Sequence, residues 1–329
     1  LTPTFEGSTP EIVRDGIRYI RLGRKIGDHC SSPHISFFFV YPRALKRYDC
    51  DLLVEDFMPP MSATFTPVWR GNRPLVASVQ WWNAETLSRQ YHLPFFIGER
   101  YLVRLYRRFV VLTEAMKRLI HSRHPKAAIE VIPNGVDDRL FALEPRYGDF
   151  ILYLGRIDLG EKGVDLMLRG YAQVSKRERV PLRVAGTGFQ WDRCQRLVDE
   201  LDLRAWVTFL GKVDGEGRAA LLSECRFVCV PSRSETFGMV IAEACAAGKP
   251  VVLFDHWPMN EVAPRGACEL VEAFSVDAYA DAMRVMLGLG ESDLAERGRR
   301  CRASAAGYDW DSVTLQQERF YEQAVAKAG

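Results

Sequence analysis

Two glutamates, Glu235 and Glu243, flank the start of a predicted helix. The polar loop that carries Glu235 follows a predicted buried strand at 227–230, and the helix begins near Gly238. A helix N-terminus leaves backbone N–H groups unpaired and carries a partial positive charge, so it favours a phosphate. Because carboxylates repel phosphate, the two glutamates are better suited to accept hydrogen bonds from hydroxyl groups, such as those of a sugar and a ribose. The spacing also fits a salt-bridged helix residue and a solvated loop residue, and this motif alone leaves both interpretations open.

A second loop brings two cations to the end of another predicted strand, at 150–154. Arg156 offers a planar guanidinium and Lys162 a point charge, and both bind diphosphates well. An isolated Arg–Lys pair is usually a solvated basic loop, but two loops from one sheet edge favour a diphosphate site. Gly186 and Gly188 follow a third strand and could pass beneath a nucleotide, although Gly-x-Gly alone is weak evidence.

Strands and helices alternate in both halves of the chain. In the first half we predict strands at 17–22, 52–55, 75–79, 109–113 and 129–132, with helices at 94–108 and 114–121. In the second half we predict strands at 150–154, 182–185, 207–210, 227–230 and 251–254, with helices at 164–175, 194–201, 218–223 and 238–247. This alternation predicts an α/β fold with parallel sheets that bind ligands at the carboxyl ends of their strands. The expected domains are 1–144 and 145–308, followed by a helix at 309–329.

Composition excludes several classes of protein. The 329 residues are 47% hydrophobic and 26% charged, as in soluble globular proteins, and suffice for about two domains. The net charge of +2 is too small for bulk nucleic-acid binding. No apolar run approaches the ~20 residues of a membrane span. With no basic-then-apolar leader, we expect a cytoplasmic protein.

The eight cysteines are scattered and form no C-x-x-C pair. In a chain of this size we expect them to be small buried hydrophobic residues of a protein in a reducing cytosol. No zinc or other metal site is expected from their spacing.

Three motifs in order resemble the retaining glycosyltransferases of family 4, which have the GT-B architecture. Glu235 to Glu243 matches the E-x7-E motif of that family, and Gly155-Arg156 with Glu161-Lys162-Gly163 matches its diphosphate loop. Segment 131–137, Val-Ile-Pro-Asn-Gly-Val-Asp, matches the turn that closes its N-terminal domain. The resemblance covers almost the whole chain. It implies two Rossmann-like domains facing across a cleft, and transfer of a hexose with retention from a nucleotide-diphosphate sugar to an unknown acceptor.

The resemblance also implies roles for individual residues. Arg156 and Lys162 would bind the pyrophosphate and act with Glu235, which would contact the transferred sugar, while Glu243 would bind the ribose. The other residues expected at the donor are Gly155, Gly186, Gly188, Lys212, Val213, Thr236, Phe237, Gly238, Met239 and Val240. Those expected on the acceptor side are Gln80, Trp81, Trp82 and Asn83. The terminal helix would cross back to the first domain. The leaving phosphate would help to deprotonate the acceptor. No cofactor or metal is expected, since no Asp-x-Asp motif sits beside these loops.

Three departures from the family keep other readings open. The chain starts where the second strand of the N-terminal domain would end, so we expect the first strand and helix to precede Leu1 in the natural protein. Gln80 stands where many relatives have His, and the loop at 255–261 lacks paired glycines and matches only at Glu261. The alternatives are a catalytically silent nucleotide-sugar-binding subunit and a GT-B epimerase. A phosphorylase would need a pyridoxal lysine, for which no site stands out.

The acceptor side is less defined. A saccharide, a lipid-linked sugar acceptor and a small molecule are all compatible with the sequence. Trp81 and Trp82 could line an acceptor subsite, although we expect at least one of them in the core. Segment 99–126 carries eight basic residues against two acidic ones and could touch anionic lipid at the inner membrane face. A predicted strand interrupts it, so a solvated face is favoured over weak peripheral membrane contact.

Overall fold

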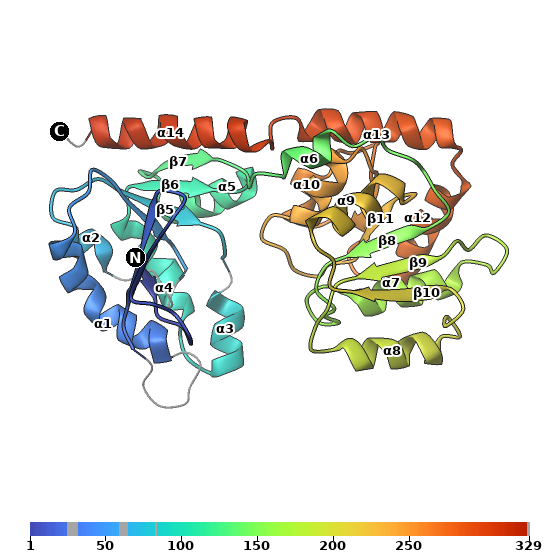
Figure 1. Ribbon diagram of the computed structural model, residues 1–329, viewed down its shortest axis with the longest axis horizontal. Helices are drawn as coiled ribbons and strands as arrows, with labels where there is room; N and C mark the ends of the chain where they lie inside the picture. The colour runs from blue at the N-terminus through green and yellow to red at the C-terminus, as the bar shows by residue number, and fades with distance from the viewer. Residues whose placement is uncertain (25–31, 59–64, 83, 328–329) are drawn as a thin grey trace. The chain divides into compact units, whose positions relative to one another are not determined.

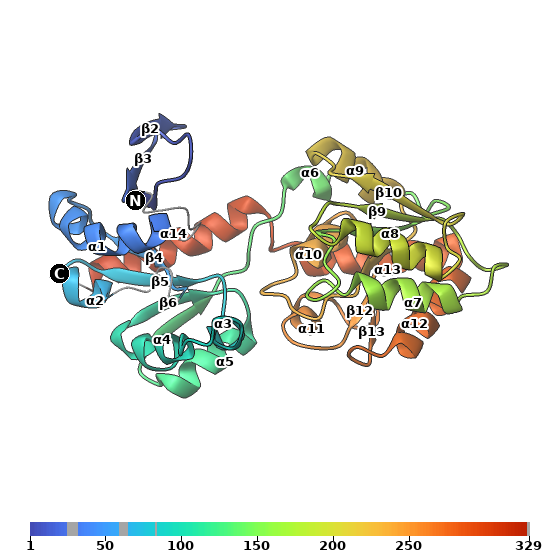
Figure 2. The same cartoon turned by 90° about the horizontal axis from the view of Figure 1, so that it is seen from below.

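A computed structural model describes residues 1–24, 32–58, 65–82 and 84–327. The chain divides into two compact units, one of 1–132 with 316–329 and the other of 133–315 (Figures 1 and 2). Each unit combines helices with a parallel sheet, so the predicted α/β class is confirmed. Among the described residues, no helix is long and apolar enough to cross a membrane.

The main sheet of the first unit has four parallel strands in sequence order. They are β4 (Leu53–Asp56), β5 (Leu75–Val79), β6 (Arg108–Val111) and β7 (Ala128–Val131). The helices of this unit are α1 (Ser32–Arg47), α2 (Thr66–Trp69), α3 (Ala84–Tyr91), α4 (Phe96–Tyr101), the 3-10 helix η1 (Leu102–Leu105) and α5 (Glu114–Arg123). Strand β5 is fully buried, and its Ala77 and Val79 pack with Phe57 and Phe109 in the core.

The predicted single helix at 94–108 is wrong. After α4 and η1 the chain becomes extended at Tyr106, and β6 begins at Arg108. The reason is the burial of Tyr106, whose hydroxyl donates to Glu55 Oε2 at 2.7 Å and whose ring packs against Phe57.

The predicted strand at 17–22 is present but does not join the main sheet. It is β3 (Ile17–Leu22), which lies between β1 (Thr2–Pro3) and the antiparallel strand β2 (Glu11–Arg14) in a separate three-stranded sheet. Asp15 and Gly16 join β2 to β3 with φ of 51° and 79°. Positive φ at both central residues is typical of a tight hairpin turn, for which Asp-Gly is a preferred sequence.

The second unit holds a six-stranded parallel sheet. Its strands are β8 (Ile151–Leu154), β9 (Leu182–Ala185), β10 (Val207–Gly211), β11 (Val228–Val230), β12 (Val251–Phe254) and β13 (Glu269–Val271). Their order is β10-β9-β8-β11-β12-β13. This is the doubly wound order, in which the winding reverses between β8 and β11. Ligands of such sheets bind beyond the carboxyl ends of the strands at this reversal.

Nine helices are described in the second unit or start there. They are α6 (Asp138–Phe141), α7 (Val164–Gln173), α8 (Trp191–Glu200), α9 (Gly215–Glu224), α10 (Met239–Ala246), α11 (Met259–Val262), α12 (Val276–Gly288), α13 (Glu291–Ala305) and α14 (Trp310–Ala326). The residues of α14 up to Leu315 belong to the second unit, and those from Gln316 onward belong to the first. In the turn at 131–137, Gly135 lies so close to the Trp310 ring that an added Cβ would be 2.4 Å from it, so the position requires glycine.

Candidate functional site

Four loops meet at one edge of the second sheet. Strands β10, β9, β8 and β11 are neighbours and parallel, so the loops that follow them leave the same edge. Backbone hydrogen bonds join these loops. Gly155 N donates to Ala185 O at 2.9 Å, and Gly186 N donates to Gly211 O at 2.7 Å. The loops therefore form one continuous surface at the point where the winding reverses.

Gly186 and Gly188 are required by the packing of two loops against each other. A Cβ on Gly186 would lie 1.8 Å from Gly155 O, and a Cβ on Gly188 would lie 2.0 Å from Ile157 O. Gly186 also has a φ of +143°. The Gly-x-Gly sequence thus lets the loop after β9 lie directly on the loop after β8.

Asp158 organises the loop that carries Arg156. The buried Asp158 carboxylate accepts hydrogen bonds from the backbone N–H groups of Gly160 (2.8 Å) and Glu161 (2.9 Å). The Arg156 guanidinium pairs with Glu161 and lies 3.7 Å from Asp158. Half of the Arg156 side chain is exposed, so a ligand can reach it.

Lys162 and Glu235 form an ion pair between the loops after β8 and β11. Lys162 Nζ lies 2.7 Å from Glu235 Oε1, and both side chains are largely buried. Ser232 Oγ donates to the same Oε1 at 2.8 Å. Glu235 Oε2 receives no hydrogen bond from the part of the chain that the structure describes, so it remains able to accept one from a ligand.

The loop after β11 is anchored to the loop after β8. The Arg233 guanidinium pairs with both carboxylate oxygens of Asp165 at 2.8 Å, and Arg233 N donates to Glu161 O at 2.8 Å. A Cβ on Gly163 would lie 2.1 Å from Pro231 O. These contacts hold Glu235 in place ahead of α10, whose N-cap Gly238 has a φ of +99°.

Glu243 is buried in α10 and pairs with a cation from the neighbouring helix α9. Arg218 Nη1, from α9, lies 2.6 Å from Glu243 Oε1. Burial raises the pKa of the Glu243 carboxyl above its ordinary value, although Arg218 opposes the shift. Arg218 was not singled out in the sequence, because nothing in the linear spacing pairs it with Glu243.

The structure brings all the predicted donor residues to this edge of the second unit. The side chain of Phe237 is buried against the Tyr308 ring, so this residue can face a ligand only with its backbone. Thr236, Met239 and Val240 are half-buried around the start of α10. Lys212 and Val213 follow β10, where Lys212 is exposed and Val213 half-buried.

The predicted acceptor-side residues follow β5 in the first unit. Gln80 is exposed and Trp81 is half-buried, while Asn83 lies outside the described residues. Trp82 stacks on Phe57 with ring centroids 5.8 Å apart, and the Arg123 guanidinium lies 4.8 Å from the Trp82 centroid.

A pocket of about 780 Å³ in the first unit was missed by the sequence analysis. Trp82, Phe96, Arg89, Arg100 and Arg123 contribute to its lining, as do Glu85 and Glu99. The available signal was the excess of basic residues at 99–126, whose partners across α3 and α4 could not be known from the sequence.

Comparison with known families divides the chain in two. Residues 1–140 match the family described as Glycosyltransferase Family 4, and residues 141–302 match Glycosyl transferases group 1. The chain is 34% identical over 209 residues to the phosphatidyl-myo-inositol mannosyltransferase of Mycolicibacterium smegmatis, which covers 60% of this chain and 52% of that protein. It is 32% identical over 245 residues to the D-inositol 3-phosphate glycosyltransferase of Mycolicibacterium paratuberculosis, with 70% and 55% covered. The chain thus spans about half the length of these curated relatives.

Solved structures share the fold. Sucrose-phosphate synthase from Thermosynechococcus elongatus superposes with a TM-score of 0.82 at 20% identity, covering 99% of this chain and 88% of that one. Anabaena HepE, solved with UDP and glucose, gives a TM-score of 0.67 at 18% identity, with 88% and 81% covered.

Proposed function

This chain belongs to glycosyltransferase family 4, with the GT-B architecture, and on that premise we propose that it transfers a hexose from a nucleotide-diphosphate sugar to an acceptor with retention of configuration. The family predicted from the motifs is confirmed. The proposal concerns the donor, the acceptor and the stereochemistry of the reaction.

One observation carries the proposal. Glu235 and Glu243 stand on either side of the α10 N-terminus, at the sheet edge where the winding reverses, with Lys162 at 2.7 Å from Glu235. Glu235 precedes this helix start in the chain, Glu243 follows it, and Lys162 lies beside Glu235. A nucleotide sugar likewise has a hydroxyl-bearing group, the sugar or the ribose, on either side of its diphosphate. The anionic centre suits the cation and the helix N-terminus, and the hydroxyl-bearing ends suit the carboxylates.

The proposed reaction depends on charge stabilisation. As the sugar leaves, negative charge grows on the diphosphate, and Arg156, Lys162 and the α10 N-terminus stabilise it. The departing phosphate accepts the proton of the acceptor hydroxyl, which attacks the same face of the sugar, so configuration is retained. No divalent metal is part of this proposal, and activity in the presence of EDTA should equal activity without it.

For the acceptor we propose a phosphorylated polyol. The pocket in the first unit gathers Arg89, Arg100 and Arg123, which suit a phosphate, and Trp82 and Phe96, which suit a ring. Of the two curated relatives, one is named for phosphatidyl-myo-inositol and the other for D-inositol 3-phosphate. A panel of myo-inositol phosphates and phosphatidylinositol vesicles therefore comes first among acceptors.

The test is a turnover assay with separate readouts for donor and product. The protein is incubated with each nucleotide sugar and acceptor, nucleoside diphosphate release is measured, and the anomeric configuration of the product is read by NMR. We expect nucleoside diphosphate to be released only when an acceptor is present. The anomeric configuration of the product should be the same as that of the donor sugar. A catalytically silent subunit would bind nucleotide without transfer or slow hydrolysis, and an epimerase would convert the sugar without an acceptor. Either result would contradict the proposed transferase activity.

A further inference from the structure

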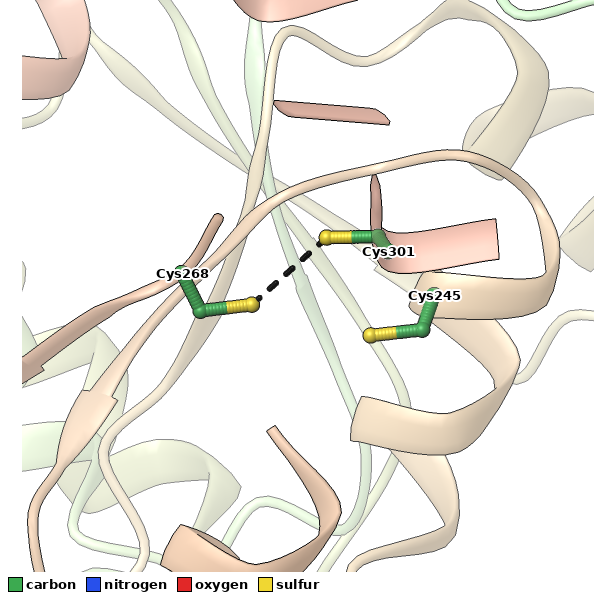
Figure 3. A group of neighbouring side chains, drawn as sticks. All are labelled: Cys245, Cys268 and Cys301. Carbon is green, nitrogen blue, oxygen red and sulfur yellow. Dashed lines mark hydrogen bonds between the residues drawn. The ribbon is translucent and has the colours of Figure 1, made fainter. Parts of the chain in front are cut away.

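Three cysteines from distant parts of the sequence converge in the core of the second unit. Cys245 lies in α10, Cys268 directly precedes β13 and Cys301 lies in α13, and their sulfur atoms point toward one another (Figure 3). All three Sγ atoms lie within 4.8 Å of one another. We propose that Cys245, Cys268 and Cys301 form a buried three-thiolate site for a soft metal ion of the Cu(I) class. This inference does not depend on the proposed transferase activity.

The spacing of the sulfur atoms fits one ion at their centre. A metal–thiolate bond is about 2.3 Å long, so three sulfurs arranged in a plane around one ion lie about 4 Å apart. Cys268 Sγ and Cys301 Sγ are 3.7 Å apart, and no pair exceeds 4.8 Å. Small side-chain adjustments therefore suffice to bring all three sulfurs to bonding distance.

The coordination number indicates the type of ion. No histidine, aspartate or glutamate joins the three cysteines within the described parts of the chain. The exposed fractions of Cys245, Cys268 and Cys301 are 1%, 4% and 0%, so water has little access as a fourth ligand. Thiolates bind both Cu(I) and Zn(II), so the number of ligands distinguishes the two ions, and structural zinc takes four. Three sulfurs in a dry site thus favour Cu(I) over Zn(II).

Binding of the ion requires all three sulfurs as thiolates. As it binds, the S–H bonds break, metal–sulfur bonds form and the protons pass to solvent, so binding should release protons.

Metal binding would join three elements of the second unit, one of which also carries Glu243. Cys245 lies two residues after Glu243 in α10, so an ion would tie this helix to α13 and to the start of β13. Binding to the folded state alone raises its stability by mass action. A rise in melting temperature with Cu(I) is therefore expected along with binding.

The test is an anaerobic titration of the reduced protein with Cu(I) against a colorimetric Cu(I) chelator. All proteins carry Cys30→Ser and Cys50→Ser, because Cys50 is only partly buried and Cys30 lies outside the described residues. We compare this background with Cys301→Ser, with Cys245→Ala, and with Cys194→Ser as a control at another buried cysteine. Circular dichroism and melting temperature establish that each variant is folded.

We expect the background and Cys194→Ser to withdraw one equivalent of Cu(I), with thiolate-to-metal absorption in the ultraviolet and a raised melting temperature. Folded Cys301→Ser and Cys245→Ala should bind more than about 100-fold more weakly, beyond the 10- to 100-fold effect of residues that only support ligands. Undiminished binding by both variants would overturn the site, as would a background protein that withdraws no Cu(I). One equivalent of Zn(II) bound in preference to Cu(I) would overturn the three-coordinate assignment.

Discussion

Lys162 Nζ lies 2.7 Å from Glu235 Oε1, which pairs the cation proposed for the diphosphate with the carboxylate proposed for the sugar. The pair links loops 73 residues apart in the sequence, and Ser232 supports the same oxygen at 2.8 Å. A pair this buried leaves an uncompensated charge when one partner is removed. A diphosphate would compete with Glu235 for Lys162, so substitutions at either residue should alter how the protein treats phosphates.

Removal of the cations should affect phosphate recognition selectively. We expect Lys162→Ala and Arg156→Ala to weaken binding of a nucleoside diphosphate much more than binding of the nucleoside. The rate of transfer should fall, because the activation free energy rises by about 2.7–4 kcal/mol, as when an oxyanion donor is deleted. Calorimetry with both ligands measures the difference. Arg204→Ala is the control. Arg204 is an exposed arginine paired with Asp199, and it precedes the amino end of β10, whereas the proposed site lies at the carboxyl ends of the strands. Equal losses for nucleoside and nucleoside diphosphate would refute the diphosphate role.

Glu235→Gln should separate catalysis from nucleotide binding. We expect transfer to be lost while nucleoside diphosphate binding is retained or becomes tighter, because Lys162 is then free to meet the phosphates. Binding is measured by calorimetry and transfer by nucleoside diphosphate release. The double variant Lys162→Ala/Glu235→Gln should lose any gain in affinity. A collapse of nucleotide binding in Glu235→Gln alone would mean that the residue has a structural role.

Glu243 should give nucleoside binding a pH dependence. Burial raises the pKa of its carboxyl, and protonation removes its negative charge and turns one of its oxygens into a donor, which weakens its acceptance of hydrogen bonds from the ribose hydroxyls. As the pH falls through this raised pKa, the carboxyl gains a proton and nucleoside affinity should fall. The folded state binds that proton more readily than the unfolded one, so the Glu243 contribution to stability decreases as the pH rises.

The Glu243→Gln variant provides the control. We expect its nucleoside affinity to be lower and flat over the same pH range, and its preference for ribose over 2′,3′-dideoxyribose to be reduced. Circular dichroism at each pH establishes that both proteins remain folded. An identical pH profile in Glu243→Gln would assign the titration to another group.

Gly163 should be needed for the fit between the loops after β8 and β11. Alanine at this position would adopt a φ of +62° and carry its Cβ to 2.1 Å from Pro231 O. Gly211 is the matched control, with a φ of +72° and no atom within 4 Å of an added Cβ. We expect Gly211→Ala to cost about 1–2 kcal/mol from the backbone conformation. Gly163→Ala should cost about 1–3 kcal/mol more from the clash. Equal urea midpoints for the two variants would show that the close contact with Pro231 is unimportant.

The sequence predicted the second unit better than the first, for a physical reason. Strands such as β8 and β12 are buried on both faces and appear as apolar runs, and helices separate them regularly. In the first unit the β2–β3 hairpin depends on an Asp15-Gly16 turn that was not weighed as a hairpin signal. The interruption after α4 depends on the burial of Tyr106, a tertiary contact with Glu55 51 residues away.

Site residues could be proposed from the sequence because parallel strands end at a common edge. That rule brings Arg156, Lys162 and Glu235 together without any knowledge of contacts. It cannot identify side-chain partners, so the pairing of Glu243 with Arg218 was missed. The cysteine cluster was missed for the same reason. Cys268 and Cys301 come from separate elements 33 residues apart, and only the packing of α13 beside β13 brings their sulfurs to 3.7 Å.

The most direct test of the central claim is a thermal-shift panel of UDP, GDP, ADP and TDP, with their common sugars, against wild type and Lys162→Ala. A ligand at a hundred times its dissociation constant stabilises the folded state by about 2.7 kcal/mol, a shift that is readily measured. We predict that one nucleoside diphosphate raises the melting temperature of the wild type and raises it less in Lys162→Ala. No shift with any nucleotide, in protein shown to be folded, would contradict the nucleotide-sugar site and with it the proposed transferase.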